Sequence, residues 1–376
     1  MSKIFDIEMS GPSITKREIS TVLDAMNSGW YGSKKFYYVE KFEKDFARFH
    51  SRKYALMTPN CTTALHLILH SLGIKKGDNV INQECTWVAA AAAVLYTGAR
   101  NNFADINEEN WCLDETSLVK KINKNTKAVI ISDIYGNMPN IRKIDKICKE
   151  NNLYLIEDSA EALGSRYYKG RAGSFGIASV FSFHRTKTLT TGEGGMLLTN
   201  NKKLYETCKF FRDQGRNKFQ TYNIDELGFK YMPFNLQAAL GYSQLKRINE
   251  IVDKKRWIFF EYKKNFNKMK NIQFNLENNN FFNGCWATTI VIGKEYNLSA
   301  KKVMSFLIKK GFPVRPFFTP LSSMKPFFNK KSQVLNKKSY DISSRGLTLP
   351  SALNLKASQI KQYSKAVIEI LNKVYQ

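Results

Sequence analysis

Two short apolar stretches, Ala128-Val-Ile-Ile-Ser132 and Leu153-Tyr-Leu-Ile-Glu157, decide the fold class of this chain. Each is a compact run of apolar residues that ends in a polar one. Strands that are buried on both faces of a parallel sheet have this composition, and functional groups gather at their carboxyl ends. We therefore predict buried parallel strands here, with chemistry-bearing side chains where the strands end.

The same alternation extends in both directions from these strands. Residues 62–72 place their leucines on one helical face, and the small residues of 88–96 indicate a further helix. Further strands are expected at 79–82, 177–183 and 195–199. Strands that alternate with helices from about residue 50 to residue 200 predict an α/β layer fold with a mostly parallel sheet.

The pattern changes after about residue 240. Long helix is expected over 240–257 and 259–266, a strand over 287–292, and an amphipathic helix over 357–375. We predict a large domain of residues 1–245, which includes the N-terminal segment, and a smaller C-terminal α+β domain of residues 246–376.

Composition excludes several other classes of protein. The 376 residues are 43% hydrophobic, which suffices for a large core, and no apolar run is long enough to span a bilayer. The N-terminus lacks the pattern of a signal peptide, so a cytoplasmic location is expected. The six cysteines form no CxxC pair and the four histidines are not at ligand spacing, so we expect neither a metal site nor disulfides.

The net charge of +26 has two interpretations. A basic surface attracts nucleic acid, a membrane face or a polyanionic substrate. The lysines are, however, spread along the chain and form no dense block with interleaved aromatic residues. This favours compositional drift, or attraction of an acidic small substrate, over a nucleic-acid-binding regulator without catalytic activity.

The segment Phe181-Ser-Phe-His-Arg-Thr-Lys187-Thr-Leu-Thr-Thr-Gly-Glu-Gly-Gly195 places a lysine between the end of a strand and a glycine-rich turn. Burial lowers the pKa of a lysine, and the neutral amine is the form that makes an imine with an aldehyde. Glycines allow the backbone to approach a ligand closely. The alternative is that Lys187 is an ordinary solvated loop residue.

A second segment, Leu155-Ile-Glu-Asp158-Ser-Ala-Glu161-Ala-Leu-Gly164, is a buried strand that ends in carboxylates. A lysine paired with an aspartate that protonates a pyridine nitrogen is the recurring arrangement around pyridoxal phosphate. Asp158 stands where that aspartate is expected, and Glu161 is placed to reach the phenolic oxygen of the cofactor. The alternative is that Glu157 or Asp158 caps the next helix.

Two further segments complete the predicted site. Thr62 and Thr63 open a helix after Thr58-Pro-Asn-Cys61, and hydroxyls with backbone N–H groups at a helix N-terminus bind anions. We predict that they hold a phosphate, together with Ser182, although ordinary capping uses the same geometry. Trp87 follows a strand and is a candidate for stacking on a cofactor ring, or alternatively a core residue.

Taken in order, these segments resemble the DegT/DnrJ/EryC1/StrS family of pyridoxal-phosphate sugar aminotransferases. Within that family, the resemblance is strongest to the perosamine-synthase-like enzymes, which aminate nucleotide-linked 4-keto-6-deoxyhexoses. It runs nearly from end to end. The matching stretches are 28–32, 60–65, 73–78, 134–137, 157–162, the Lys187 segment, 235–241, 315–318 and 349–355.

The resemblance implies a role for each candidate residue. Lys187 matches the Schiff-base lysine, Asp158 the partner of the pyridine nitrogen, and Glu161 the neighbour of the phenolic oxygen. The ring-stacking aromatic and the phosphate contacts are matched by Trp87, Thr62, Thr63 and Ser182. The family fold is of the aspartate-aminotransferase type (fold type I), in homodimers whose active sites contain residues from both subunits.

One position departs from the family pattern. Members often carry Arg, Lys or Asn after the tyrosine of the stretch that reads Phe229-Lys-Tyr-Met-Pro-Phe-Asn235 here, and that residue reaches the phosphate bound to the neighbouring subunit. This chain has Met232, which cannot donate such a bond. Lys230 or Asn235 is the expected substitute from the partner subunit.

The function implied by the resemblance is that of a transaminase of class EC 2.6.1. It takes an amino group from glutamate, carries it as pyridoxamine 5'-phosphate and delivers it to C4 of the keto sugar, for surface-polysaccharide, lipopolysaccharide O-antigen or glycoconjugate biosynthesis. Tyr31 and Arg315 are candidate substrate contacts, or ordinary loop residues. Amination at C3, or of a cyclitol ketone, is the alternative within the family.

Overall fold

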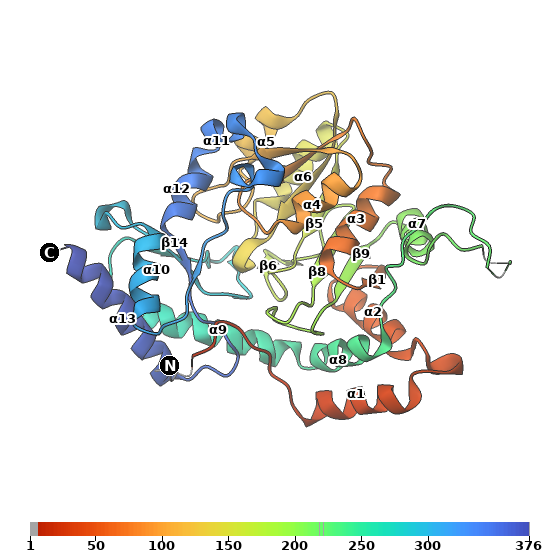
Figure 1. Cartoon of the computed structure of the whole chain (residues 1–376), viewed down its shortest axis with the longest axis horizontal. Coiled ribbons are helices and arrows are strands. Elements are labelled where there is room, and N and C mark those ends of the chain that lie inside the picture. The colour runs from red at the N-terminus through yellow and green to blue at the C-terminus, as the bar shows by residue number, and fades with distance from the viewer. Residues whose placement is uncertain (1–6, 218, 221, 376) are drawn as a thin grey trace.

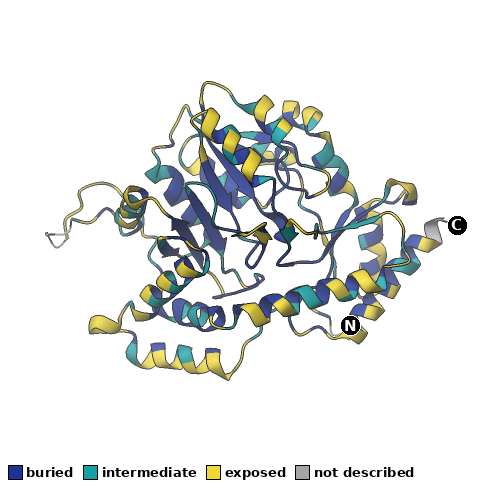
Figure 2. Ribbon diagram, turned by 180° about the vertical axis from the view of Figure 1, so that it is seen from behind, coloured by how far each residue is buried: buried dark blue, intermediate teal, exposed yellow. Residues whose placement is uncertain are grey.

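The computed structural model of the chain describes residues 7–217, 219–220 and 222–375. Its centre is a seven-stranded sheet whose strands are almost wholly buried (Figures 1 and 2). In sheet order the strands are β1 (Tyr54–Thr58), β9 (Gly195–Thr199), β8 (Ala178–Ser182), β5 (Tyr154–Asp158), β4 (Thr126–Ser132), β2 (Asn79–Gln83) and β3 (Arg100–Ala104). Only β9 runs antiparallel to its neighbours, β8 and β1. The mostly parallel α/β sheet that the alternation predicts is therefore confirmed.

Helices pack on both faces of this sheet. A cluster of buried apolar side chains, among them Leu65 and Ile130, joins the sheet to helix α3, and another, among them Ile131 and Ile144, joins it to α6. The helices of this part are α1 (Lys16–Ser28), α2 (Tyr37–Phe49), α3 (Cys61–Ser71), α4 (Ala89–Tyr96), α5 (Glu115–Lys121), α6 (Ile141–Glu150) and α7 (Lys202–Arg212), with short 3-10 turns η1 (Gly32–Lys34) and η2 (Ile134–Gly136). The sequence predicted α3, α4 and the five strands it proposed to within two residues at each end.

The expected long helix is divided into two. Helix α8 (Asn235–Leu245) and helix α9 (Ile248–Asn265) run end to end along one side of the molecule, with α1 beside α8 (Figure 1). Helix begins five residues earlier than predicted and breaks at Arg247, whose backbone leaves the helical region. The guanidinium of Arg247 pairs there with the buried carboxylate of Glu18 on α1, at 3.1 Å. This contact between distant segments is not visible in the helical periodicity.

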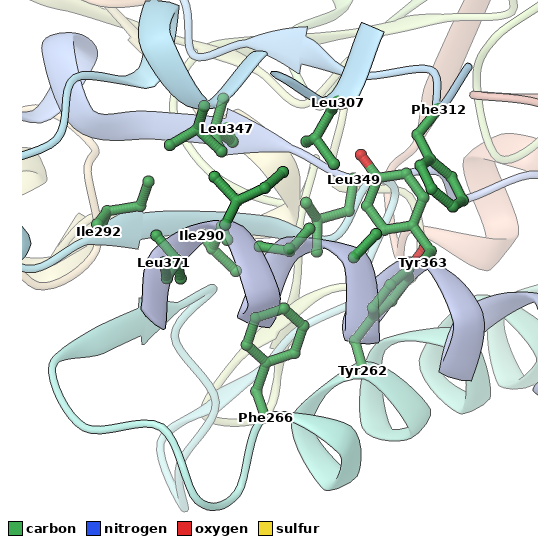
Figure 3. Close-up of a cluster of buried hydrophobic side chains, with 14 of the residues drawn as sticks. Tyr262, Phe266, Ile290, Ile292, Leu307, Phe312, Leu347, Leu349, Tyr363 and Leu371 are labelled. Carbon is green, nitrogen blue, oxygen red and sulfur yellow. The ribbon is translucent and has the colours of Figure 1, made fainter. Parts of the chain in front are cut away.

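The second half of the chain forms a four-stranded antiparallel sheet. Its order is β10 (Ile272–Phe274), β12 (Thr289–Ile292), β14 (Gly346–Thr348) and β13 (Arg315–Pro316). Side chains from α9, this sheet and α13 (Ala357–Tyr375) meet in one apolar cluster (Figure 3). The other elements here are α10 (Ala300–Lys309), α11 (Lys330–Leu335), α12 (Lys337–Arg345) and the 3-10 turns η3 (Lys294–Tyr296), η4 (Leu321–Ser323) and η5 (Lys325–Phe327).

Two segments connect the halves. Ile7 packs in the apolar cluster of the second half, and Ser351 N–H donates to the Met9 carbonyl at 2.9 Å. A small sheet joins β11 (Phe281–Phe282) to β6 (Arg166–Tyr167) and β7 (Gly170–Arg171). We propose a division near residue 245, at the break between α8 and α9, with the N-terminal strap crossing it.

The structure also bears on membrane insertion, metal binding and disulfide bonding. Within the described residues, no helix is long and apolar enough to cross a membrane. The same residues contain no group of three or more His, Cys, Asp or Glu side chains that could hold a metal ion. The six cysteines are all described, and each is buried with a free thiol.

Candidate active site

The candidate site lies where β5 and β8 end and helix α3 begins. Strand pairing sets Thr58, Gly195 and Ser182 side by side across three strands. A Cβ on Gly195 would lie 2.4 Å from the carbonyl carbon of Asn60, closer than real side-chain contacts allow. Glycine at this position therefore lets the first turn of α3 pack directly against the sheet beside Ser182.

Lys187 lies in the turn after β8 with most of its side chain buried. Its Nζ is 3.0 Å from Glu161 Oε1 and 4.0 Å from the centroid of the Trp286 ring. Only 13% of the lysine side chain is exposed. Lys187 is therefore not a solvated loop residue, the alternative that its glycine-rich surroundings left open.

Asp158 ends strand β5, and its carboxylate has one oxygen in use. Oδ1 accepts the Ala160 N–H at 3.2 Å and lies 3.8 Å from the Cys61 thiol. Among the described residues, none donates a hydrogen bond to Oδ2. Burial raises the pKa of Asp158 to about 6, against the opposing effects of the Ala160 N–H and of Lys187. A donor or a cation placed at Oδ2 would stabilise the ionised carboxylate.

The neighbouring Glu157 points to the other face of the sheet, as strand alternation requires. Its carboxylate accepts the backbone N–H groups of Gly173 and Phe175, both at 2.9 Å. Glu157 thus braces a loop on the far face, whereas Asp158 faces Cys61 and Lys187. This assigns the two adjacent carboxylates to different tasks, which the sequence alone left open.

Glu161 is positioned by a second hydrogen bond on its other oxygen. Oε2 accepts the backbone N–H of Tyr135 at 3.0 Å, and Tyr135 has the left-handed φ of 54°. A tyrosine holds this conformation only where its surroundings impose it. The Tyr135 ring is stacked on Phe318 and lies parallel to Trp286, so an aromatic cluster fixes the residue that orients Glu161.

The start of α3 offers free donors near this lysine-carboxylate group. Asn60 caps the helix by accepting the Thr63 N–H at 2.9 Å, and the Thr63 hydroxyl donates to the Asn60 carbonyl at 2.8 Å. The cap is therefore Asn60 and not a threonine. No hydrogen bond within the described part of the chain occupies the hydroxyl of Thr62, and Ser182 Oγ accepts only the His184 N–H, at 3.3 Å.

These groups match the chemistry of pyridoxal phosphate. The site has a shielded lysine amine, a buried carboxylate with a free oxygen for a protonated ring nitrogen, and hydroxyls at a helix N-terminus for a phosphate. The most direct observation is Asp158 Oδ2, which accepts no hydrogen bond from the described residues and is therefore available to a protonated ring nitrogen. Lys187, Asp158, Thr62 and Ser182 are the residues that would hold the cofactor.

The remaining predicted residues lie at different distances from this centre. Trp87 is 61% exposed, and its ring contacts Phe318 of the aromatic cluster at 6.4 Å between centroids. Arg315, on β13, is one of the cations that lower the pKa of His184, for which burial is the main cause. Tyr31 is 87% exposed and remote from the described contacts of Lys187.

Asn235 does not present its side chain outward. It is buried at the start of α8, where Oδ1 accepts the Tyr38 N–H at 2.9 Å and Nδ2 donates to the Lys34 carbonyl at 3.5 Å. These bonds hold the side chain within its own subunit. Lys230 is exposed instead, paired with Asp213 at 3.0 Å. Of the two expected substitutes for Met232, Lys230 is the one with an accessible side chain.

Sequence reasoning missed three residues that touch the site. Trp286 contacts Lys187, Tyr135 holds Glu161, and Cys61 approaches Asp158. Tyr135 and Cys61 lie in stretches that the family resemblance picked out, but nothing there signalled a role. Trp286 precedes a strand in the second half of the chain, about 100 residues from Lys187, and no local pattern connects them.

A separate cavity of about 600 Å³ lies at the outer edge of the sheet, beyond β3. Residues of α5 and α11 line it, among them Lys121 and Lys331. None of the candidate site residues lines this cavity. The chemistry of the side chains, rather than the size of the hollow, identifies the site.

Known proteins resemble this chain over nearly its whole length. A profile of the DegT/DnrJ/EryC1/StrS aminotransferase family matches residues 12–368. The chain is 36% identical to the GDP-perosamine synthase of Escherichia coli O157:H7 over 358 residues, which cover 95% of this chain and 96% of that protein. It is 34% identical to the GDP-perosamine synthase of Vibrio cholerae over 361 residues, 96% of this chain and 98% of that protein.

Solved structures show the same architecture. PseC of Helicobacter pylori, an aminotransferase of pseudaminic acid biosynthesis, superposes with a TM-score of 0.88 at 27% identity, covering 98% of this chain and all of that one. The sugar aminotransferase Spr1654 of Streptococcus pneumoniae, solved in its PMP form, superposes with a TM-score of 0.90 at 23% identity, covering 98% of this chain and all of that one. The fold-type prediction is therefore confirmed.

Proposed function

The chain belongs to the DegT/DnrJ/EryC1/StrS aminotransferase family of pyridoxal-phosphate-dependent sugar aminotransferases, and from that premise we propose that it transfers an amino group from glutamate to C4 of a GDP-linked 4-keto-6-deoxyhexose. The observation that carries the chemistry is Lys187, shielded and paired with Glu161, beside the buried carboxylate of Asp158. The extent of the similarity to GDP-perosamine synthases supports the choice of substrate and a role in surface-polysaccharide biosynthesis, such as that of O-antigen.

Pyridoxal phosphate, when bound, supplies an aldehyde that captures amines and a ring that takes up electrons. Each proposed residue then has one task. Asp158 uses its free Oδ2 to hold the proton of the ring nitrogen, which keeps the ring electron-poor. Lys187, as a free amine, removes a proton from the carbon that bears the donor nitrogen. As an ammonium, it then gives a proton back in the following step. Glu161 keeps Lys187 within reach between these transfers.

The phosphate is proposed to lie at the first turn of α3. Thr62 contributes its hydroxyl and backbone N–H there, and Ser182 contributes a hydroxyl from the end of β8. Thr63, the other predicted ligand, has its N–H and hydroxyl bonded to Asn60 and supports the shape of this turn. The partial positive charge of the helix N-terminus favours the phosphate dianion. Trp87, more than half exposed at the edge of the same region, is the proposed stacking partner of the ring.

We also propose a homodimer that completes the site. One face of α1 exposes Ile19, Leu23 and Met26 at helical spacing, each about half exposed (Figure 2). An arm between α7 and α8 projects from the body (Figure 1) and exposes Phe219 and Tyr222 almost fully. Apolar surface of this kind is costly in water and is typical of subunit interfaces. Lys230, at the base of this arm, is the proposed contact with the phosphate bound to the partner.

Arg315 and Tyr31 are the proposed substrate contacts. Arg315 is exposed near His184 and is suited to a diphosphate. Tyr31 lies on the exposed turn after α1, beside the proposed interface. A cytoplasmic location is proposed because glutamate and nucleotide-linked sugars are cytoplasmic metabolites.

The proposal is tested in two steps with purified protein. The absorbance of the protein with bound pyridoxal phosphate is recorded before and after glutamate is added. The cofactor's absorbance band at the edge of the visible range is expected to bleach. Addition of GDP-4-keto-6-deoxymannose should then restore the band and yield a 4-amino sugar, identified by mass spectrometry and NMR. Bleaching with glutamate but no product from any nucleotide-linked 4-keto sugar would reject the substrate. A product aminated at C3 would reject the assigned position.

A further inference from the structure

Trp286 contacts the same nitrogen of the candidate catalytic lysine that pairs with Glu161. The centroid of the indole ring lies 4.0 Å from Lys187 Nζ, and Glu161 Oε1 lies 3.0 Å from the same nitrogen. The ring is only 9% exposed. The lysine nitrogen is thus held between a carboxylate and the face of an aromatic ring, in a part of the protein from which water is largely excluded.

The indole ring is itself fixed on three sides. Its Nε1–H donates to the carbonyl of Thr186, the residue before the lysine, at 2.8 Å. The ring lies parallel to Tyr135, with centroids 6.1 Å apart and an angle of 10°. The carbonyl of Trp286 accepts a hydrogen bond from the fully buried Lys255 at 3.1 Å. The position of the ring relative to Lys187 is therefore set by several contacts and not by chance packing.

An aromatic face distinguishes between the two forms of a lysine. The negative face of the indole ring attracts an ammonium ion but gains almost nothing from a neutral amine. Cation–π attraction is stronger where water is largely excluded, as it is around this lysine. A Trp286 face this close to Lys187 Nζ therefore favours a lysine ammonium that stays beside Glu161.

We propose that Trp286 is the positioning residue of Lys187, and that its indole face helps to hold the lysine beside Glu161 once the released amine has taken up a proton. In this position the lysine stores the proton that it delivers in the next transfer. Trp286 comes from the second half of the chain, so a residue distant in sequence completes the surroundings of the lysine. The inference rests on the proposed function, but the labelling test below does not require that function to be correct.

The test measures how fast Lys187 reacts with an amine reagent in the protein without cofactor. Wild type, Trp286→Leu and Trp286→Phe are treated with trinitrobenzene sulfonate between pH 6 and pH 10, and labelling of the Lys187 peptide is followed by mass spectrometry. Trp286→Leu should label about three- to tenfold faster near pH 7, because less of the amine is protonated. Further samples are labelled at about pH 11, above the ordinary lysine pKa of about 10.4, and the gain should be much smaller there than near pH 7.

Two comparisons separate this effect from better access to the lysine. Trp286→Phe keeps an aromatic face and should stay within about twofold of wild type. Trp257→Leu removes a similar contact elsewhere, where Lys254 Nζ lies 3.6 Å from the Trp257 ring centroid, and should leave labelling of Lys187 unchanged. Should Trp286→Leu fold poorly, fluorinated tryptophan placed at position 286 weakens the negative face with little change of shape.

Each outcome supports or rejects the proposed role of Trp286. A gain at low pH that becomes much smaller at high pH, with small effects in Trp286→Phe and Trp257→Leu, supports the assignment. An equal gain at every pH means that Trp286 only shields the lysine, and no gain means that it does not act on Lys187. The proposed function fails separately, if Lys187→Ala still transfers amino groups, and that result leaves the labelling profile unaffected.

Discussion

Lys187 Nζ and Glu161 Oε1 lie 3.0 Å apart, and this ion pair joins the turn after β8 to the loop after β5. The two residues are 26 positions apart in the chain. Glu161 is oriented by Tyr135 from a third strand end, so three consecutive strands of the sheet converge on one amine. The carboxyl edge of a parallel sheet brings such loops together as a consequence of its topology.

Replacing Lys187 with alanine should abolish amino transfer while the protein still folds. Its ammonium makes one ion pair with Glu161 and one ring contact, so loss of the side chain costs little stability compared with the loss of the reacting amine. Bleaching by glutamate and formation of the amino sugar are measured separately, with circular dichroism as the check on folding. Lys301→Ala, which removes an exposed lysine on α10, is the matched control. Normal turnover by Lys187→Ala would overturn the assignment.

Binding of pyridoxal phosphate should weaken as the pH falls below about 6. Burial raises the pKa of Asp158 to about 6 in the protein without cofactor, so the carboxyl becomes protonated below that pH. A protonated carboxyl cannot accept the proton of the ring nitrogen at Oδ2, and the affinity should fall by up to about tenfold per pH unit. Fluorescence titrations at several pH values measure this. In Asp158→Asn the affinity should be lower at pH 8 and should lose this pH dependence.

Lys255 should make the stability of the protein rise between pH 7 and pH 9. Burial lowers its pKa to about 7, whereas the unfolded chain keeps the ordinary value near 10.5. Between these values the unfolded state binds more protons, so the penalty for burying the ammonium shrinks as the pH rises. Wild type should gain about 2 kcal/mol relative to Lys255→Met over this interval. The free energy of unfolding is measured in urea at several pH values for both proteins. An equal change with pH in the two proteins would disprove the prediction.

Lysine placed on the exposed face of α1 should separate the proposed dimer. Met26 is 50% exposed, and Met26→Lys would bury a charge in the proposed interface. Light scattering after gel filtration should then give a mass near 43.3 kDa, that of one chain. Ile308 on α10 is 59% exposed and serves as the control, because Ile308→Lys should leave the mass unchanged. Equal masses for both variants would remove α1 from the interface.

Alanine at Gly195 should disturb the phosphate end of the site. The added Cβ would lie 2.4 Å from the Asn60 carbonyl group and 2.6 Å from the Cys61 nitrogen, so the first turn of α3 must shift. We expect a loss of about 1–3 kcal/mol in stability and weaker binding of pyridoxal phosphate. Gly11→Ala is the control, because its Cβ would meet only the Ala352 side chain at 3.7 Å. Unchanged affinity in Gly195→Ala would place the phosphate elsewhere.

The strands and helices around the site could be read from the sequence because their signals are local. Ala128–Ser132 and Leu153–Glu157 are buried runs whose period and length favour strands, and β9 and α13 were predicted with their observed ends. The division of the long helix at Arg247 could not be read in this way. It depends on a buried pair with Glu18, more than 200 residues earlier.

The sequence by itself determined the α/β class and singled out Lys187 and Asp158 as the candidate lysine and aspartate, because these follow from hydrophobic period and from motifs in a fixed order. Only the tertiary structure decided which neighbours those residues have. It brought Trp286 to Lys187 and Cys61 to Asp158, and it enclosed Asn235 within its own subunit. Such contacts arise from the packing of distant segments, and packing is a property of the whole chain that no local pattern encodes.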